Sequence, residues 1–188
     1  MKVEHIMNDL TQWCQENICD KVHFLKPDER NAGTGYIPEW IHPTAFPMFI
    51  PSKDMLPPDV QTKYPAMCVQ LIDGEDDLKE KKMSLDIRIS LAIWAPGTYK
   101  VNEAKYELTR DTSGAKEILR FVDFTKETLN KNMYIEGCRI DRNTPMKFGF
   151  FTQEETLVNA YPEWYAYITF RTTCGMAASR NNIYKDLL

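Results

Sequence analysis

The 188-residue chain has three histidines, His5, His23 and His42, and none of them lies in a motif that carries chemistry. No GxSxG or QACxG sequence surrounds a serine or a cysteine, so the usual signatures of an activated nucleophile are absent. The one glycine pair, Gly33-Thr34-Gly35, lacks the preceding strand and following helix of a phosphate-binding loop. We therefore expect no catalytic residue, no metal site and no cofactor, and we expect that the protein is not an enzyme.

Long apolar runs and an excess of basic residues are also missing. No window approaches the roughly 18 consecutive apolar residues of a membrane span, and the opening MKVEHIMNDL does not have the pattern of a signal peptide. The net charge of −4 and the pI near 5.5 leave no basic face for nucleic acid. We expect a protein made in the cytoplasm that contacts no membrane and binds no nucleic acid specifically.

The five cysteines are odd in number, scattered, and contain no CxxC pair. Zinc sites need closely spaced ligands, and disulfides are rare in cytosolic proteins. We therefore expect reduced and mostly buried thiols at Cys14, Cys19, Cys68, Cys138 and Cys174.

The strongest secondary-structure signal is the stretch Met83–Trp94, in which Leu85, Ile87, Ile89, Leu91 and Ile93 alternate with other residues. Strict period-two alternation predicts a long strand with one face on a core. The opposite face begins charged and ends apolar with Trp94, so we expect its second half to meet something beyond its own domain.

The other elements follow from the same periodicities. Apolar residues at helical spacing predict a helix from Val3 to about Ile18, and a second helix capped by Thr112 or Ser113 and running to about Lys131. We predict further strands at residues 66–72, 133–140, 147–152 and 162–174, the last one central, and loops at residues 73–82 and 97–110. The order predicts a single α+β domain over residues 1–188: a mostly antiparallel sheet with an N-terminal helix and a second helix packed on one face.

Residues 26–65 form a long proline- and aromatic-rich segment, which we call the arm. Proline this dense excludes helix interiors and central strands. The arm either lies over its own domain or docks on a neighbouring subunit, and the sequence leaves both open. With the apolar cluster in the C-terminal extension, residues 175–188, the second alternative gives a hypothetical subunit or partner interface at Tyr36, Trp40, Phe46, Phe49, Ile183 and Tyr184.

The loop expected at residues 73–82 carries acids at alternate positions, as calcium loops do. However, its glycine is Gly74 rather than the residue after the third acid, and no glutamate closes the loop. We expect a solvated hairpin tip. If the protein encloses a lumen, the side chains facing it would be Asp73, Glu75, Asp76 and Asp77.

Three segments give the chain a family resemblance: FPMFIPSKDMLPPDVQTKYPAMCVQLIDGED, SLAIWAPGTY and YPEWYAYITF, after a helix at the start of the chain. In these the chain resembles the tail terminator, or tail-completion, proteins of phages and prophages of Gram-positive bacteria. The three segments cover 51 of the 188 residues, and none of them is a catalytic motif. The arm is longer than a compact terminator domain needs, which is where this chain departs from the family.

The resemblance implies a virion structural protein that is made in the host cytoplasm and closes into a ring, usually a hexamer. Such a ring ends the tail tube and offers a surface to the head-side connector or neck protein. The implied partners are further copies of the chain, the tail tube protein, that connector and, in a contractile tail, the sheath. The alternatives are another neck, head-tail connector or tube-associated protein, or a small cytosolic enzyme or binding module.

Overall fold

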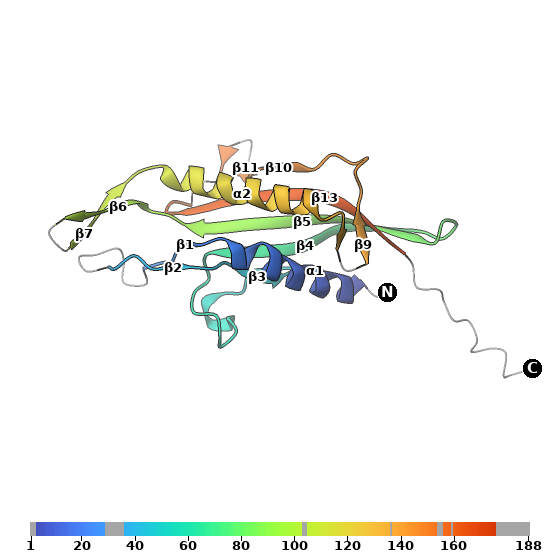
Figure 1. Ribbon diagram of the computed structural model, residues 1–188, viewed down its shortest axis with the longest axis horizontal. Coiled ribbons are helices and arrows are strands. Elements are labelled where there is room, and N and C mark those ends of the chain that lie inside the picture. Colours follow the sequence, from blue (N-terminus) through green and yellow to red (C-terminus); the bar gives the residue numbers. More distant parts are fainter. Residues whose placement is uncertain are drawn as a thin grey trace, which may run out of the picture.

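A computed structural model describes residues 3–28, 36–102, 105–135, 137–153, 156–158 and 160–175. Its centre is a seven-stranded sheet in the order β3-β4-β5-β13-β9-β8, with β10 also paired to β13 (Figure 1). The strands are β3 (Thr44–Pro47), β4 (Ala66–Asp77), β5 (Lys82–Trp94), β8 (Tyr134–Ile135), β9 (Cys138–Ile140), β10 (Lys147–Phe150) and β13 (Glu163–Gly175). All of the pairings are antiparallel except the one between β3 and β4.

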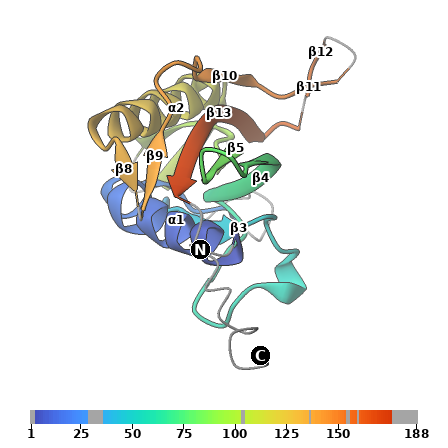
Figure 2. The same ribbon diagram turned by 90° about the vertical axis from the view of Figure 1, so that its right-hand side faces the viewer.

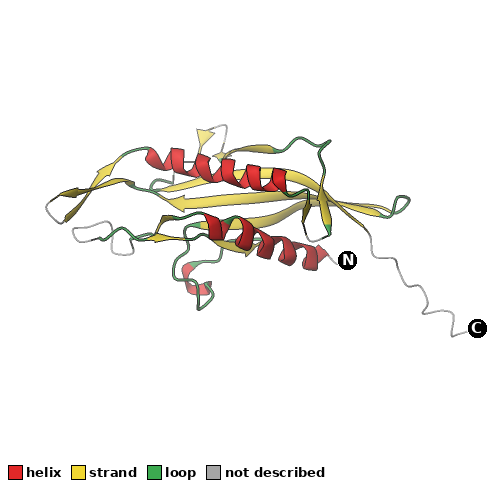
Figure 3. Ribbon diagram, viewed as in Figure 1, coloured by secondary structure: helices red, strands yellow, loops and turns green. Residues whose placement is uncertain are grey.

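Two helices, α1 (Val3–Asn17) and α2 (Ser113–Lys131), cover the same face of this sheet (Figures 2 and 3). The remaining elements are short: β1 (Phe24–Leu25) with β2 (Trp40–Ile41), β6 (Gly97–Asn102) with β7 (Lys105–Arg110), β11 (Thr152–Gln153) with β12 (Thr156–Leu157), and the 3-10 turns η1 (Cys19–Lys21) and η2 (Lys53–Met55). The predicted α+β fold, with both helices on one face, is confirmed.

The main core lies between the helices and the sheet. The apolar residues of β5 that alternate from Leu85 to Ile93 are at most 1% exposed, and the buried side chains of α1 and α2 pack in the same cluster. β5 pairs with β13 along its whole length, from Lys82 opposite Gly175 to Trp94 opposite Glu163. β13 is therefore central, as predicted, with β5 on one side and β9 and β10 on the other.

A second apolar cluster lies on the opposite face, at the end of β5. Trp94 and Ala92 pack there with Phe46 and Tyr64 from the arm, and the partly buried Tyr36 and Tyr165 join them. The apolar end of that face thus meets the chain's own arm, and the expectation that it contacts something outside the domain is wrong.

Three segments expected as loops or single strands are hairpins instead. β4 continues to Asp77, so the acidic residues belong to the end of the β4–β5 hairpin, which we call the β4–β5 ribbon; β13 pairs with the other edge of β5 as far as Lys82, and only residues 78–81 form the turn. Gly97–Asn102 and Lys105–Arg110 pair as the β6–β7 hairpin, and Tyr134–Ile140 contains two paired strands, β8 and β9. In each case pairing with a neighbouring strand satisfies the backbone amides, which lets polar sequences adopt strand structure.

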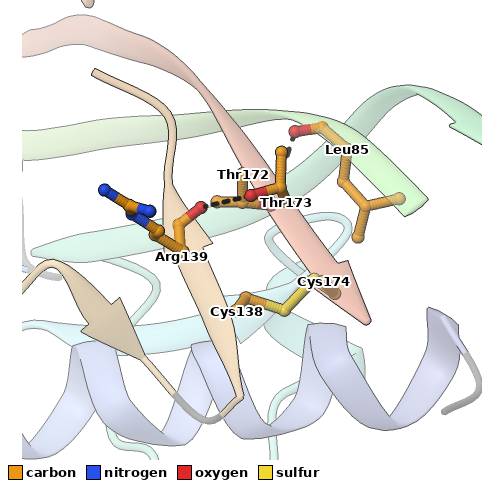
Figure 4. Close-up of a disulfide and its surroundings, with 6 residues drawn as sticks. All are labelled: Leu85, Cys138, Arg139, Thr172, Thr173 and Cys174. Carbon is orange, nitrogen blue, oxygen red and sulfur yellow. Dashed lines mark hydrogen bonds between the residues drawn. A yellow bond between two sulfur atoms is a disulfide. The ribbon is translucent and has the colours of Figure 1, made fainter. Parts of the chain in front are cut away.

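The expectation of five reduced thiols is wrong for two of them. Cys138 on β9 and Cys174 on β13 are directly opposed, with Cα atoms 4.5 Å apart, and form a disulfide (Figure 4). The residues are 36 apart in the sequence, so no local spacing pattern indicates the bond. Cys14, Cys19 and Cys68 are free and buried, as expected.

Candidate functional site

The histidines do not assemble a catalytic or metal site. The rings of His23 and His42 stack with centroids 3.9 Å apart, and Nδ1 of His42 lies 2.9 Å from the carbonyl oxygen of Val22. His5 is exposed on α1, away from this pair. Across the described ranges, no three His, Cys, Asp or Glu side chains gather in a way that would hold a metal ion.

The free cysteines are poor nucleophiles in this environment. Burial raises the pKa of Cys14 to about 12 and that of Cys68 to about 11, and burial also raises the pKa of Cys19. Nucleophilic attack and metal binding both need the thiolate, and these three groups remain protonated at neutral pH. They act as small apolar side chains of the interior.

A chain of hydrogen-bonded side chains joins the arm to the central strand, and no pattern in the sequence indicates it. The hydroxyl oxygens of Tyr64 and Tyr165 lie 2.7 Å apart, and Tyr165 donates a hydrogen bond to the Glu163 carboxylate. Burial is the main cause that raises the pKa of Tyr165, and the hydrogen bond to Glu163 raises it further. A phenol that stays protonated is a fixed hydrogen-bond donor. The hydrogen bonds among Tyr64, Tyr165 and Glu163 therefore anchor the arm on β13.

The residues proposed for an interface divide into four groups. Trp40 and Phe49 are 58% and 59% exposed, so both are available to a partner. Phe46 is 4% exposed within the second cluster, and its predicted interface role is wrong. Tyr36 is half-buried against Trp94 and Tyr99 and donates a hydrogen bond to the Lys26 carbonyl, so it mainly holds the arm in place. Ile183 and Tyr184 lie outside the described residues.

The acidic residues proposed for a lumen lie on β4, in the β4–β5 ribbon at one end of the sheet (Figure 1). Glu75 pairs with Arg171 of β13, and Asp73 accepts the backbone N–H of Gly74. Asp77 accepts the backbone N–H groups of Lys79 and Glu80 and so shapes the turn. Asp76 has no hydrogen bond or ion pair to the described part of the chain.

Exposed apolar side chains also occur where the sequence did not suggest an interface. On the β6–β7 hairpin, Val101 is 70% exposed and Tyr106 is 43% exposed. The alternation of Tyr99 and Val101 with polar residues was the available signal for a strand, but the short length and high polarity of the segment obscured it. This hairpin extends past the end of the sheet opposite to the β4–β5 ribbon (Figure 1).

The face of the sheet opposite the helices is polar between the second cluster and the ribbon. Along this face, Arg88 lies opposite Thr169 on β13, and Thr169 lies opposite Lys147 on β10. A groove of about 300 Å³ runs over these residues and is also lined by Asp86, Thr144 and Arg171.

Neither of the helices in the described part of the chain is long and apolar enough to cross a membrane. No known protein family, curated protein or solved structure matches the chain. The arrangement of exposed surfaces is therefore the basis for a functional proposal.

Proposed function

We propose that the chain is a structural protein of a phage tail or a phage-tail-like particle, and that it assembles into a ring that ends the tail tube and joins it to the head-side connector. The proposal rests on the resemblance to tail terminators and on the surfaces described above. In the same proposal, the tail tube protein and the connector are partners, and a contractile tail would add the sheath.

The segments that carry the resemblance form one region of the fold. Residues 46–76 supply Phe46 and Tyr64, residues 90–99 supply Trp94, and residues 161–170 supply Tyr165, all to the second cluster. The strands in these segments, β4, β5 and β13, are direct neighbours in the sheet. The three segments therefore pack together as one unit of the fold, which supports the use of the resemblance in this proposal.

The observation that carries the proposal is that different elements present separate exposed apolar side chains. Trp40, Phe49 and Met55 of the arm are 58%, 59% and 65% exposed, and Val101 is exposed on a hairpin that projects from the sheet. A ring is built from heterologous contacts, in which one surface of each subunit meets a different surface of the next. Large apolar side chains exposed in groups are typical of such interaction surfaces.

Electron microscopy of negatively stained protein, alone and mixed with tail tubes, tests this proposal. We expect rings or discrete caps at tube ends. The double variant Trp40→Ala/Phe49→Ala should fold normally and lose capping, whereas Tyr134→Ala, which removes an exposed aromatic residue from β8 at the other edge of the sheet, serves as the control. If the wild-type protein ignores the tubes and forms no ring, the terminator proposal is wrong, and a connector elsewhere in the neck or an unrelated binding module becomes the better explanation.

A further inference from the structure

On the open face of the sheet lie two cations that have no acidic partner among the described residues. Arg88 of β5, Thr169 of β13 and Lys147 of β10 lie in one line across three adjacent strands, and we call these residues the cation row. Adjacent strands are about 4.8 Å apart, so the backbones of Arg88 and Lys147 are separated by about 10 Å. A carboxylate fits between two cationic side chains at this separation, above the threonine hydroxyl.

The acids near the row are already used by another residue. Arg171 forms ion pairs with Glu75 and with Asp86, the latter at 3.8 Å. Arg88 contacts the Tyr167 ring, 5.8 Å from its guanidinium carbon, and Lys147 has no ion pair; neither cation meets an acid within the described ranges. The Arg88 Nε atom is buried and has no hydrogen-bond partner there.

The β4–β5 ribbon offers the complementary charge. Asp76 is unpaired within the described residues, and Glu80 has only Lys82, at 3.9 Å, as a neighbouring cation. The cation row crosses β5 at Arg88, whereas the ribbon turn begins at Lys82. At roughly 3.3 Å per residue, these two points of β5 are about 20 Å apart. The tip of the same chain cannot reach the row, so a match between the two requires a second copy.

We propose that the cation row binds the carboxylates of Asp76 and Glu80 from the ribbon of a second copy of this chain. This contact deepens the proposed ring assembly and rests on it, because the ribbon and the row are different surfaces of one subunit. Successive copies joined in this way make a heterologous interface that is able to close.

Charge reversal tests the contact directly. Arg88→Glu/Lys147→Glu should weaken self-association at low salt by at least about tenfold, measured by sedimentation velocity. Asp76→Lys/Glu80→Lys should weaken self-association to the same extent. This variant keeps the hydrogen bonds from the backbone N–H groups to Asp77 that shape the turn. Mixing the two variants should restore association, because the reversed row meets a reversed ribbon. Lys116→Glu/Lys131→Glu, which changes the net charge equally at two exposed positions of α2 on the other side of the sheet, is the control.

A carbodiimide cross-link locates the contact independently of ring formation. Equal amounts of isotopically light and heavy full-length protein are mixed, coupled and digested, and we expect mixed-isotope peptides that join Lys147 to Asp76 or Glu80. Row variants that associate like the control, or the absence of these peptides, would overturn the inference even if wild-type protein caps tail tubes. Conversely, these cross-links without any capping would overturn the terminator proposal alone. Binding of a labelled single-stranded oligonucleotide that is lost in Arg88→Glu/Lys147→Glu would assign the row to phosphate and also overturn the inference.

Discussion

The indole of Trp164 occupies the space that a side chain at Gly114 would need: a Cβ at Gly114 would lie 2.1 Å from Nε1 of Trp164. Nε1 donates a hydrogen bond to the carbonyl oxygen of Ala95, 3.0 Å away. The first turn of α2 therefore rests directly on the beginning of β13, and the absence of a side chain at Gly114 sets how closely the helix approaches the sheet.

Replacing Gly114 with alanine should destabilise the protein. Alanine gains about 1 kcal/mol of helix propensity over glycine, but overpacking against a fixed indole costs about 1–3 kcal/mol. We expect a net loss in the free energy of unfolding, measured by urea denaturation. Gly175→Ala is the control, because nothing lies within 4 Å of its Cβ position. A stabilised Gly114→Ala variant would show that the indole moves aside at little cost.

Phe46 and Trp40 should respond oppositely to truncation, although both are aromatic residues of the arm. Phe46→Ala removes a side chain that is 4% exposed and should lower the free energy of unfolding by about 3–5 kcal/mol. Trp40→Ala removes one that is 58% exposed and should change it by only about 0.5 kcal/mol. Chemical denaturation of both variants provides the measurement. Equal losses would mean that Trp40 also belongs to the interior.

Asp111 should make stability depend on pH in the acid range. Its carboxylate accepts hydrogen bonds from the Ser113 backbone N–H and the Thr98 hydroxyl, each at 2.7 Å, so it caps α2 and ties it to β6. The Ser113 and Thr98 hydrogen bonds lower the pKa of Asp111 from 3.8 to about 2. The stabilisation is thus fully present above pH 3.8 and is lost as the pH falls toward 2.

The variant Asp111→Ala should have a lower melting temperature than wild type at neutral pH, and the difference should shrink as the pH falls through that window. Thermal unfolding followed by circular dichroism across the acid range measures the difference. Asp54→Ala, which alters an exposed acid in η2, is the comparison. A difference that does not change with pH would mean that the carboxylate charge contributes nothing to the cap.

The disulfide predicts a definite thiol count. Unfolded protein without reductant should titrate as three thiols, and reduced protein as five. Removing the cross-link with Cys138→Ser/Cys174→Ser should lower the free energy of unfolding by about 2–4 kcal/mol, because the bond closes a 36-residue loop in the unfolded chain. Five reactive thiols without reductant would show that the pair is reduced in the isolated protein.

Sequence periodicity was sufficient for the elements that bury one face. Leu85, Ile89 and Ile93 identified β5, and the apolar spacing in the first helix identified α1, because each element contributes a continuous stripe to one core. These stripes also predicted the layer of two helices on one side of a mostly antiparallel sheet. Local pattern carries this information because burial of one face follows the helical or strand period.

Features formed between distant segments were not available from such patterns. Phe46 and Phe49 both lie in the proline-rich arm, and no sequence pattern tells the buried ring from the exposed one. In the folded protein, Phe46 is covered by the cluster that contains Trp94, whereas Phe49 stays exposed. The acidic part of β4 has the sequence pattern of a loop, because its strand structure depends on pairing with β5 and not on a core. The cation row likewise depends on the register of three strands, as Arg88 and Lys147 are remote in the chain.

The central position of β13 has a consequence for how the molecule folds. Ile89 and Ile168 are paired in the middle of the sheet although they are far apart in the sequence. Pairings of such high contact order form slowly, and until β13 arrives the edge of β5 is an open template for other strands. During synthesis the β4–β5 hairpin therefore waits with one edge unpaired, and we expect self-association at this edge to compete with folding whenever expression is fast or the C-terminal strand is truncated.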